Sequence, residues 1–390
     1  MRIKGLDGLR AVAFLLVFFF HVNWLPFGWV GVQLFYVLSG FLITGILTEM
    51  KPVLSGGMYF VKFYGRRFLR IFPLYYFYLL AIWLIVRLME SFHFKTSTTE
   101  LFHDHFPYAL AYFYNFFMAT KYFVGTSVFL SHFWSLAVEE QFYIVWPLLI
   151  LLTPQKKQKH VFIGIILLST LFRLVTLMWA STHSMGFLQH DPNLLVYVLP
   201  FSHIDAFALG ALLTVIKIPR ARTQIKILLV SLPILGVLST LLSLQNSTGL
   251  PLLKIISSII ASGDTNLLFN FGFPLLLADS YKAVWGYAAI NYLFTLLIQG
   301  VAFEGWLNRI LESQLMRYLG RISYGLYVYH FAIIWFVSVP FGFSNLTPLP
   351  FAPAAGALIL TTLVASLSYR WLEKPLIDLK DKFFAVPAQN

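Results

Sequence analysis

Long apolar runs separated by short polar breaks are the feature that most limits what this chain can fold into. Ten runs are predicted to be membrane-spanning helices: 8–25, 29–48, 71–89, 136–152, 161–181, 194–216, 226–244, 283–302, 321–340 and 353–372. Charged residues make up 11% of the chain, whereas soluble domains carry about 25%. We therefore predict an all-α fold, a polytopic integral membrane helix bundle.

The predicted bundle forms one transmembrane domain over residues 1–375, and 376–390 is expected to be a short cytoplasmic tail. The basic N-terminus followed by an apolar run imitates a secretion signal. No small-x-small cleavage pattern follows it, so we expect an uncleaved first helix.

Two segments do not fit a simple span. Residues 105–124 are apolar but short, and residues 250–280 are interrupted by Gly263, Asp264 and Pro274. Because irregular backbone at membrane depth must be covered by protein or line a wet cavity, we expect re-entrant or interfacial segments on the outer side.

The net charge of +12 comes from short basic clusters between the apolar runs. The positive-inside rule explains this pattern better than nucleic-acid binding does. It places both termini in the cytoplasm. The absence of Cys excludes disulfides and thiolate catalysis.

The first predicted helix carries ionisable residues, which are costly in hydrocarbon. Ten residues separate Arg10 from His21, a rise of about 16 Å and nearly three turns. Arg10 is therefore expected near the cytoplasmic mouth, with His21 on nearly the same face in the outer part. Asp7 lies one turn before Arg10 and is expected to pair with it. Alternatively, Arg10 is a plain anchor and His21 an interfacial residue.

Three arginines, Arg66, Arg67 and Arg70, are expected at the cytoplasmic start of the third span. Arg67 and Arg70 share a helix face, and paired guanidinium groups suit phosphate. A role as interfacial anchors is the alternative.

Glu139 and Glu140 follow Trp134 at the outer opening of the fourth predicted span. Adjacent residues point about 100° apart on a helix, so at most one of the two carboxylates is expected to face a given site. Capping of free amides at the helix N-terminus is the alternative.

Other polar residues stand inside predicted spans. Asp205 lies in the sixth, and His330 lies near the middle of the ninth, after Tyr324. A hydrogen-bonded His–Tyr pair between helices also explains the latter. His103 and His105 suggest a metal, but an irregular outer loop lacks the needed geometry, so no metal site is expected.

Together these segments resemble acyltransferase family 3 of membrane proteins. The matching stretches occur in the family's order: 5–11 with His21, 31–43 including Ser39, 66–76, 133–147, 322–327 with His330, and 373–375. The sequence departs from the pattern at Gln33, where the family often has Asp, so this position is given no role. None of these 390 residues is expected to form the soluble hydrolase-like domain that some members carry.

The resemblance implies a transmembrane acyltransferase domain that moves an acyl group, often acetyl, from a cytoplasmic coenzyme A thioester to a carbohydrate on the far side. The family's arginine–histidine pattern falls on Arg10 and His21, and its basic pair falls on Arg67 and Arg70. The implied partners are acyl-CoA, a cell-surface or lipid-linked glycan and membrane lipids, and not nucleic acid. The implied location is the bacterial inner membrane.

We hypothesise that His21 is a general base acting on a sugar hydroxyl. Arg67 and Arg70, with Arg66, hold acetyl-CoA. Arg10 orients the thioester, and Glu139 or Glu140 binds the acceptor. Structural or substrate-binding roles are expected for the remaining candidates: Asp7, Ser39, Trp134, Asp205, Tyr324 and His330.

Three alternatives stay open. A transient acyl-enzyme is less favoured because the chain has no Cys and only scattered Ser and Thr. A transporter or flippase of a glycan or lipid-linked sugar would use the same charged cavity without chemistry. A scaffolding membrane protein would need no site.

Overall fold

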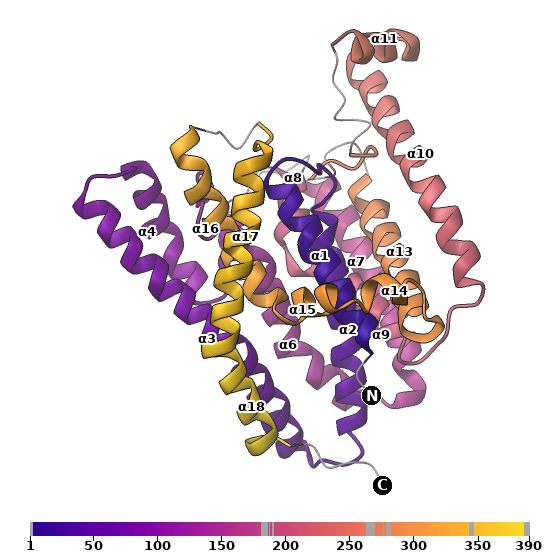
Figure 1. The fold of residues 1–390 in the computed structure, drawn as a ribbon. Coiled ribbons are helices and arrows are strands. Elements are labelled where there is room, and N and C mark those ends of the chain that lie inside the picture. The colour runs from indigo at the N-terminus through magenta and orange to yellow at the C-terminus, as the bar shows by residue number, and fades with distance from the viewer. Residues whose placement is uncertain are drawn as a thin grey trace.

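Apart from turns and one isolated bridge between Thr120 and Leu188, the regular structure of the described residues is helical. The computed structural model describes residues 3–180, 186, 188, 191–262, 270–275, 277, 282–342 and 347–385. The helices form one bundle (Figure 1). In its first half they are α1 (Lys4–His21), α2 (Val30–Met50), α3 (Gly56–Ser91), α4 (Thr96–Leu110), α5 (Tyr114–Met118), α6 (Phe133–Leu152), η1 (Gln155–Lys157), α7 (Gln158–Ala180), α8 (Pro192–Val198), η2 (Pro200–Ser202) and α9 (Ile204–Leu212). In its second half they are α10 (Ala221–Thr248), α11 (Leu252–Ser262), α13 (Lys282–Glu304), α14 (Asn308–Leu311), α15 (Gln314–Arg321), α16 (Ser323–Ser338), η3 (Val339–Phe341), α17 (Phe351–Ser368), η4 (Tyr369–Glu373) and α18 (Lys374–Phe383).

Seven helices of the described chain are long and apolar enough to cross a membrane. They are α2, α3, α6, α7 with η1, α10, α13 and α17 with its continuation, and the bent pair α8 and α9 would make an eighth. The expected count of ten is not confirmed. The other two expected spans correspond to α1, which carries Lys4, Asp7 and Arg10 within 18 residues, and to α16, which has 16 residues. These apolar helices are those of an integral membrane protein.

α3 begins earlier than the third span expected from the sequence. Its 36 residues correspond to roughly 54 Å, against a hydrocarbon thickness of about 30 Å. The basic segment lacks proline and packs along α18 (Figure 1), where Arg66 donates a hydrogen bond to the Phe384 carbonyl at 3.1 Å. Arg66, Arg67 and Arg70 therefore lie within the helix and not at its start.

α2 packs against α1, α6, α9 and α13. It crosses α9 at two glycines. A side chain at Gly40 would collide with the Phe207 carbonyl, and one at Gly210 would collide with the Val37 carbonyl. Small residues let two membrane helices approach closely, and this crossing fixes α2, which carries Ser39, in the bundle.

The sixth expected span is broken. Its two parts, Pro192–Val198 and Pro200–Leu212, are bent by 80° relative to each other. Pro200 has no N–H to continue the helical ladder, so carbonyls at the break need other partners. Arg173 of α7 supplies one by donating a hydrogen bond to the Ser202 carbonyl at 2.5 Å.

The two segments that did not fit simple spans are partly described. Residues 105–118 fold into the end of α4 and into α5, and the Tyr75 hydroxyl of α3 donates to the Ala109 carbonyl at 2.7 Å. α10 leans away from the bundle and leads into α11 (Figure 1). Gly263 and Asp264 lie outside the described residues, and re-entrant placement stays a prediction.

α17 continues into α18 through a single π-helical turn, η4. Such turns inside a helix occur frequently at functional sites. α18 reaches Phe383, so residues 376–383 of the expected tail are helical. The start of α1 and the end of α18 lie at the same end of the bundle (Figure 1).

Candidate active site

A cavity of about 270 Å³ lies between α1, α2, α3, α6, α16 and α18. It brings together residues that are far apart in the sequence. The sequence-predicted residues in its lining are Arg10, Ser39, Arg66, Arg67, Arg70, Glu139, Glu140 and Tyr324. We refer to it as the cationic cavity, because its wall carries five cations.

The five cations come from three helices. Arg70 stands four residues after Arg66 and three after Arg67 on α3, which makes it a neighbour of both on the helix surface. Arg10 comes from α1 and Lys380 from α18. Lys380 has no counterpart among the residues predicted from the sequence. Guanidinium groups clustered around one cavity favour a ligand with several phosphates.

The arginines are held by specific neighbours. Asp7 accepts a hydrogen bond from Arg10 Nη1 at 3.2 Å, as its spacing predicted. The guanidinium carbon of Arg67 lies 5.5 Å from the ring centroid of Tyr143 and 5.8 Å from that of Phe63. Cation–π contact of this kind orients a guanidinium while leaving its N–H donors available.

Both carboxylates of α6 reach the cationic cavity, although at most one was expected to face a given site. Glu139 Oε1 accepts hydrogen bonds from Ser39 Oγ and from the Tyr143 hydroxyl, both at 2.5 Å. The expectation failed because two neighbouring faces of α6 border the cavity, one with Ser135 and Glu139 and the other with Leu136 and Glu140. Since α6 begins at Phe133, the two glutamates also lie nearly two turns inside the helix and beside the arginines.

Tyr327 of α16 and Ser135 of α6 also line the cavity. The Tyr327 hydroxyl and Ser135 Oγ are 2.5 Å apart. The Tyr36 hydroxyl donates to the Ser135 carbonyl at 3.0 Å. These contacts give the cavity lining a second, uncharged polar group of side chains.

A pair of histidines lies behind Tyr327. His330 Nε2 is 2.9 Å from His21 Nδ1, and His330 Nδ1 is 2.6 Å from the Tyr327 carbonyl. His132 packs against the same group, with its ring centroid 5.3 Å from that of His330. His21 is therefore linked to the cationic cavity through His330 and Tyr327.

The sequence profile of a family described as "Acyltransferase domain" (Acyl_transf_3) matches residues 3–370. This chain belongs to that acyltransferase family. The resemblance seen in the sequence motifs is thereby confirmed over nearly the whole chain.

Relatives of this family member include two proteins of Staphylococcus aureus. One, from strain COL, is named "Putative O-acetyltransferase SACOL0978" and is 29% identical over 96% of this chain and 57% of its own length. The other, "O-acetyltransferase OatA" of strain NCTC 8325 / PS 47, is 28% identical over 98% of this chain and 58% of its own length. The chain thus spans less than three fifths of the length of these relatives. No solved structure was found to be significantly similar to it.

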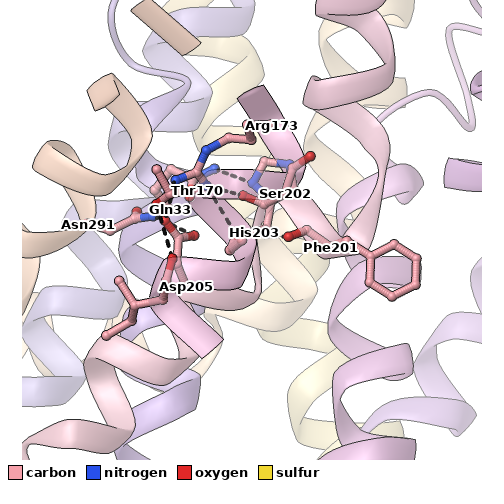
Figure 2. A network of polar contacts seen from close by, with 10 residues as sticks. Gln33, Thr170, Arg173, Phe201, Ser202, His203, Asp205 and Asn291 are labelled. Atoms are coloured by element: carbon pink, nitrogen blue, oxygen red, sulfur yellow. Dashed lines mark hydrogen bonds and ion pairs between the residues drawn. The ribbon is translucent and has the colours of Figure 1, made fainter. Parts of the chain in front are cut away.

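In this member of the family, Asp205 and Trp134 lie away from the cationic cavity. Asp205 Oδ2 accepts a hydrogen bond from Arg173 Nη2 at 2.9 Å, and Asn291 Nδ2 lies 3.3 Å from Oδ1. Figure 2 shows this network beside η2 and the start of α9, and all three side chains are fully buried. The Trp134 ring packs against Tyr197, with centroids 4.4 Å apart. We conclude that Asp205 acts in the packing of the broken span.

Gln33, which was given no role, belongs to the same network. Its Nε2 lies 3.0 Å from His203 Nδ1, and His203 Nε2 is 2.7 Å from the Tyr197 carbonyl. Because a carbonyl only accepts, His203 donates from Nε2 and receives a hydrogen bond from Gln33 at Nδ1. Gln33 thereby ties α2 to the start of α9 (Figure 2).

Sequence reasoning missed His132, Ser135, Tyr327 and Lys380 as site residues. Ser135 and Tyr327 stand inside the stretches that carried the resemblance, so they were within reach of that signal. His132 directly precedes one such stretch, whereas Lys380 lies beyond the last of them. No single-residue pattern marks these side chains, since their proximity depends on how α6, α16 and α18 pack.

The outer histidines have partners of their own. His103 Nε2 lies 2.5 Å from Glu90 Oε1, and His105 Nδ1 lies 2.6 Å from the Tyr114 hydroxyl. Within the described ranges, no three His, Asp or Glu side chains are grouped as a metal site requires. Burial lowers the pKa of His105 and so favours its neutral form.

Proposed function

We propose that this chain is a membrane O-acyltransferase that moves an acyl group, in the first instance acetyl, from acyl-CoA to a hydroxyl of a cell-surface or lipid-linked glycan. The observation that carries the proposal is the cationic cavity, which runs from a wall of arginines to Tyr327, next to the His21–His330 pair. Membership of the family supports acyl transfer, and the O-acetyltransferase names of the relatives support acetyl as the group.

The donor is assigned to the cationic side. Acyl-CoA carries its phosphates at one end and its thioester at the end of a thin pantetheine arm. Arg67 and Arg70 lie in the cavity wall and are suited to grip phosphate through forked hydrogen bonds, with Arg66 and Lys380 beside them. The arm then extends toward Tyr327, and the charged groups stay at the mouth.

The acceptor hydroxyl approaches from the side of His21. Its oxygen attacks the thioester carbonyl carbon, a C–O bond forms, and the C–S bond breaks. His21 takes the hydroxyl proton as general base, and the coenzyme A thiolate that leaves takes up a proton to become the thiol. Direct transfer of this kind needs no acyl-enzyme.

Arg10 and the two glutamates complete the proposed site. Arg10, held by Asp7 at 3.2 Å, is placed to orient the thioester or stabilise the charge that develops on its oxygen. Glu139, fixed by Ser39 and Tyr143, balances the charge of Arg67 while the donor is absent. Acceptor binding by Glu139 or Glu140 stays a prediction. We place the protein in the bacterial inner membrane, with both termini in the cytoplasm.

Calorimetric titration of purified protein with acetyl-CoA tests the donor. Arg67→Ala/Arg70→Ala is expected to weaken binding by at least about tenfold, since each charge-assisted hydrogen bond contributes about 1.5–3 kcal/mol. The matched control is Arg317→Ala/Arg321→Ala, which removes two arginines of α15 that do not line the cavity. Absence of binding to well-folded wild type would contradict the donor assignment.

Transfer itself is tested in proteoliposomes. Acetyl-CoA labelled in the acetyl group is expected to label a glycan acceptor, and His21→Ala is expected to lower the rate by about 10²–10⁴-fold while donor affinity is unchanged. A folded His21→Ala variant with full activity would contradict the assignment of His21 as general base. Movement of glycan across the vesicle without coenzyme A would favour the transporter.

A further inference from the structure

We infer that His330 is a positioning residue that holds His21 as its Nδ1–H tautomer and so leaves Nε2 as the basic nitrogen of that ring. The inference rests on the proposed function only for its kinetic consequence. The tautomer itself is a property of the folded protein and follows from two hydrogen bonds.

The proton of His330 is fixed by the backbone. Its Nδ1 lies 2.6 Å from the Tyr327 carbonyl, and a carbonyl oxygen can only accept, so Nδ1 carries the hydrogen. The side chain is fully buried, and an unpaired charge in such a place is costly. A neutral His330 therefore has a bare, accepting Nε2.

His21 faces that acceptor. Its Nδ1 is 2.9 Å from His330 Nε2, so His21 must donate from Nδ1. The hydrogen of neutral His21 is therefore on Nδ1.

The consequence concerns the lone pair of His21. In a neutral imidazole one nitrogen donates and the other accepts, and the partner of one sets the state of the other. With Nδ1 committed to His330, the lone pair is on Nε2. When Nε2 takes a proton, the Nδ1–H···Nε2 bond to His330 becomes charge-assisted and stronger. His330 thus directs the base and stabilises its charged form.

His132 does not compete for this role. Its Nε2 lies 3.1 Å from the Val328 carbonyl, and its ring is perpendicular to that of His330. Its contact with His330 is therefore a ring contact, and the nitrogen-to-nitrogen bond belongs to His21.

Nitrogen-15 NMR of protein labelled at histidine tests the tautomer directly. The His21 signals are identified by their loss in His21→Gln. Wild type is expected to show a protonated Nδ1 and a bare Nε2 at His21. His330→Phe, which keeps a ring but removes the acceptor, is expected to show a mixture or the opposite tautomer. A wild-type His21 protonated at Nε2 overturns the inference, whether or not His330→Phe folds.

Kinetics separates positioning from mere packing. His330→Phe is expected to lower kcat about tenfold to a hundredfold, a part of the full contribution of a general base, with KM for acetyl-CoA unchanged. His330→Gln, whose carbonyl oxygen can accept from His21, is expected to recover part of that loss. Tyr329 lies on the same helix as His330, and Tyr329→Phe, which removes only its hydrogen bond to Ser368 of α17, is the control. Equal loss in the Gln and Phe variants would contradict positioning. If wild type transfers no acyl group, the proposed function fails while the NMR result still decides the tautomer.

Discussion

Tyr327 contacts Ser135 with its hydroxyl, at 2.5 Å, and His330 with its main-chain carbonyl, at 2.6 Å. The same residue therefore lines the cationic cavity and holds the histidine pair. It forms the boundary between the proposed donor site and the proposed base.

Replacing Tyr327 by Phe tests this boundary. The ring remains and the hydroxyl is lost, while the carbonyl contact to His330 is kept. A hydrogen bond of about 1 kcal/mol predicts a transfer rate roughly fivefold lower, with acetyl-CoA affinity unchanged. Rates of acetyl transfer and calorimetric affinities measure both. A variant that loses affinity for acetyl-CoA and keeps its turnover would show that this hydroxyl acts in donor binding and not in transfer.

The buried Arg173–Asp205 pair is predicted to be essential for stability. Both side chains are 0% exposed, and removal of one partner leaves an uncompensated buried charge that costs about 3–5 kcal/mol. Arg173→Ala is expected to lower the unfolding temperature in detergent strongly and to reduce the yield of folded protein.

The control for this pair is Arg87→Ala. Arg87 pairs with Glu90 at 2.8 Å but is 60% exposed, so its loss should cost less than about 1 kcal/mol. Equal unfolding temperatures for the two variants would show that the network at the break of α8 and α9 is dispensable.

The crossing of α2 and α9 is predicted to require glycine at one position and not at another on the same helix. Gly40→Ala places a methyl group against the Phe207 carbonyl, whereas Gly45 has open space around it. Overpacking costs about 1–3 kcal/mol, so Gly40→Ala should destabilise the protein and Gly45→Ala should not. Thermal unfolding of both variants in one detergent gives the comparison. Similar values would mean that α2 and α9 can separate without cost.

The stability of the folded protein is predicted to depend on pH through His105, which lies in α4. Burial lowers the pKa of this histidine, while an unfolded histidine titrates near about 6.5. The unfolded state therefore binds the proton more readily, so the contribution of His105 is present above about pH 6.5 and is lost as the pH falls. Wild type should lose more stability between pH 7.5 and 5.5 than His105→Gln does. Identical pH profiles for the two proteins would contradict this.

Much of the fold is visible in the sequence because apolar runs of membrane length have few other uses. Every expected span has a helix at its position, but fewer than ten of these helices are long and apolar enough to cross a membrane. The exceptions have local causes. α1 carries three charged residues, α16 is short, and Pro200 breaks the sixth span.

The candidate site was predictable to a smaller degree. Arg10, Arg67 and Glu139 carry charges in apolar surroundings and attract notice on that ground. Their meeting in one cavity depends on helix packing, which no local pattern encodes. Asp205 attracted the same notice, yet its partner Arg173 lies 32 positions earlier on another helix. A charged residue within a predicted span thus indicated a buried polar group. It did not indicate whether that group belongs to a structural ion pair or to the candidate active site.

The π-helical turn between α17 and α18 changes the direction in which the side chains of α18 point relative to those of α17. One additional residue in a helical turn rotates everything that follows by about 100° relative to a regular α-helix. The residues of α18 that meet the bundle are therefore shifted by about 100° in angular position from those predicted by continuing the pattern of α17 past Tyr369–Glu373. Lys380 faces the cationic cavity in this rotated frame. A chain shortened by one residue at the turn would keep both helices but turn this lysine away from the cavity.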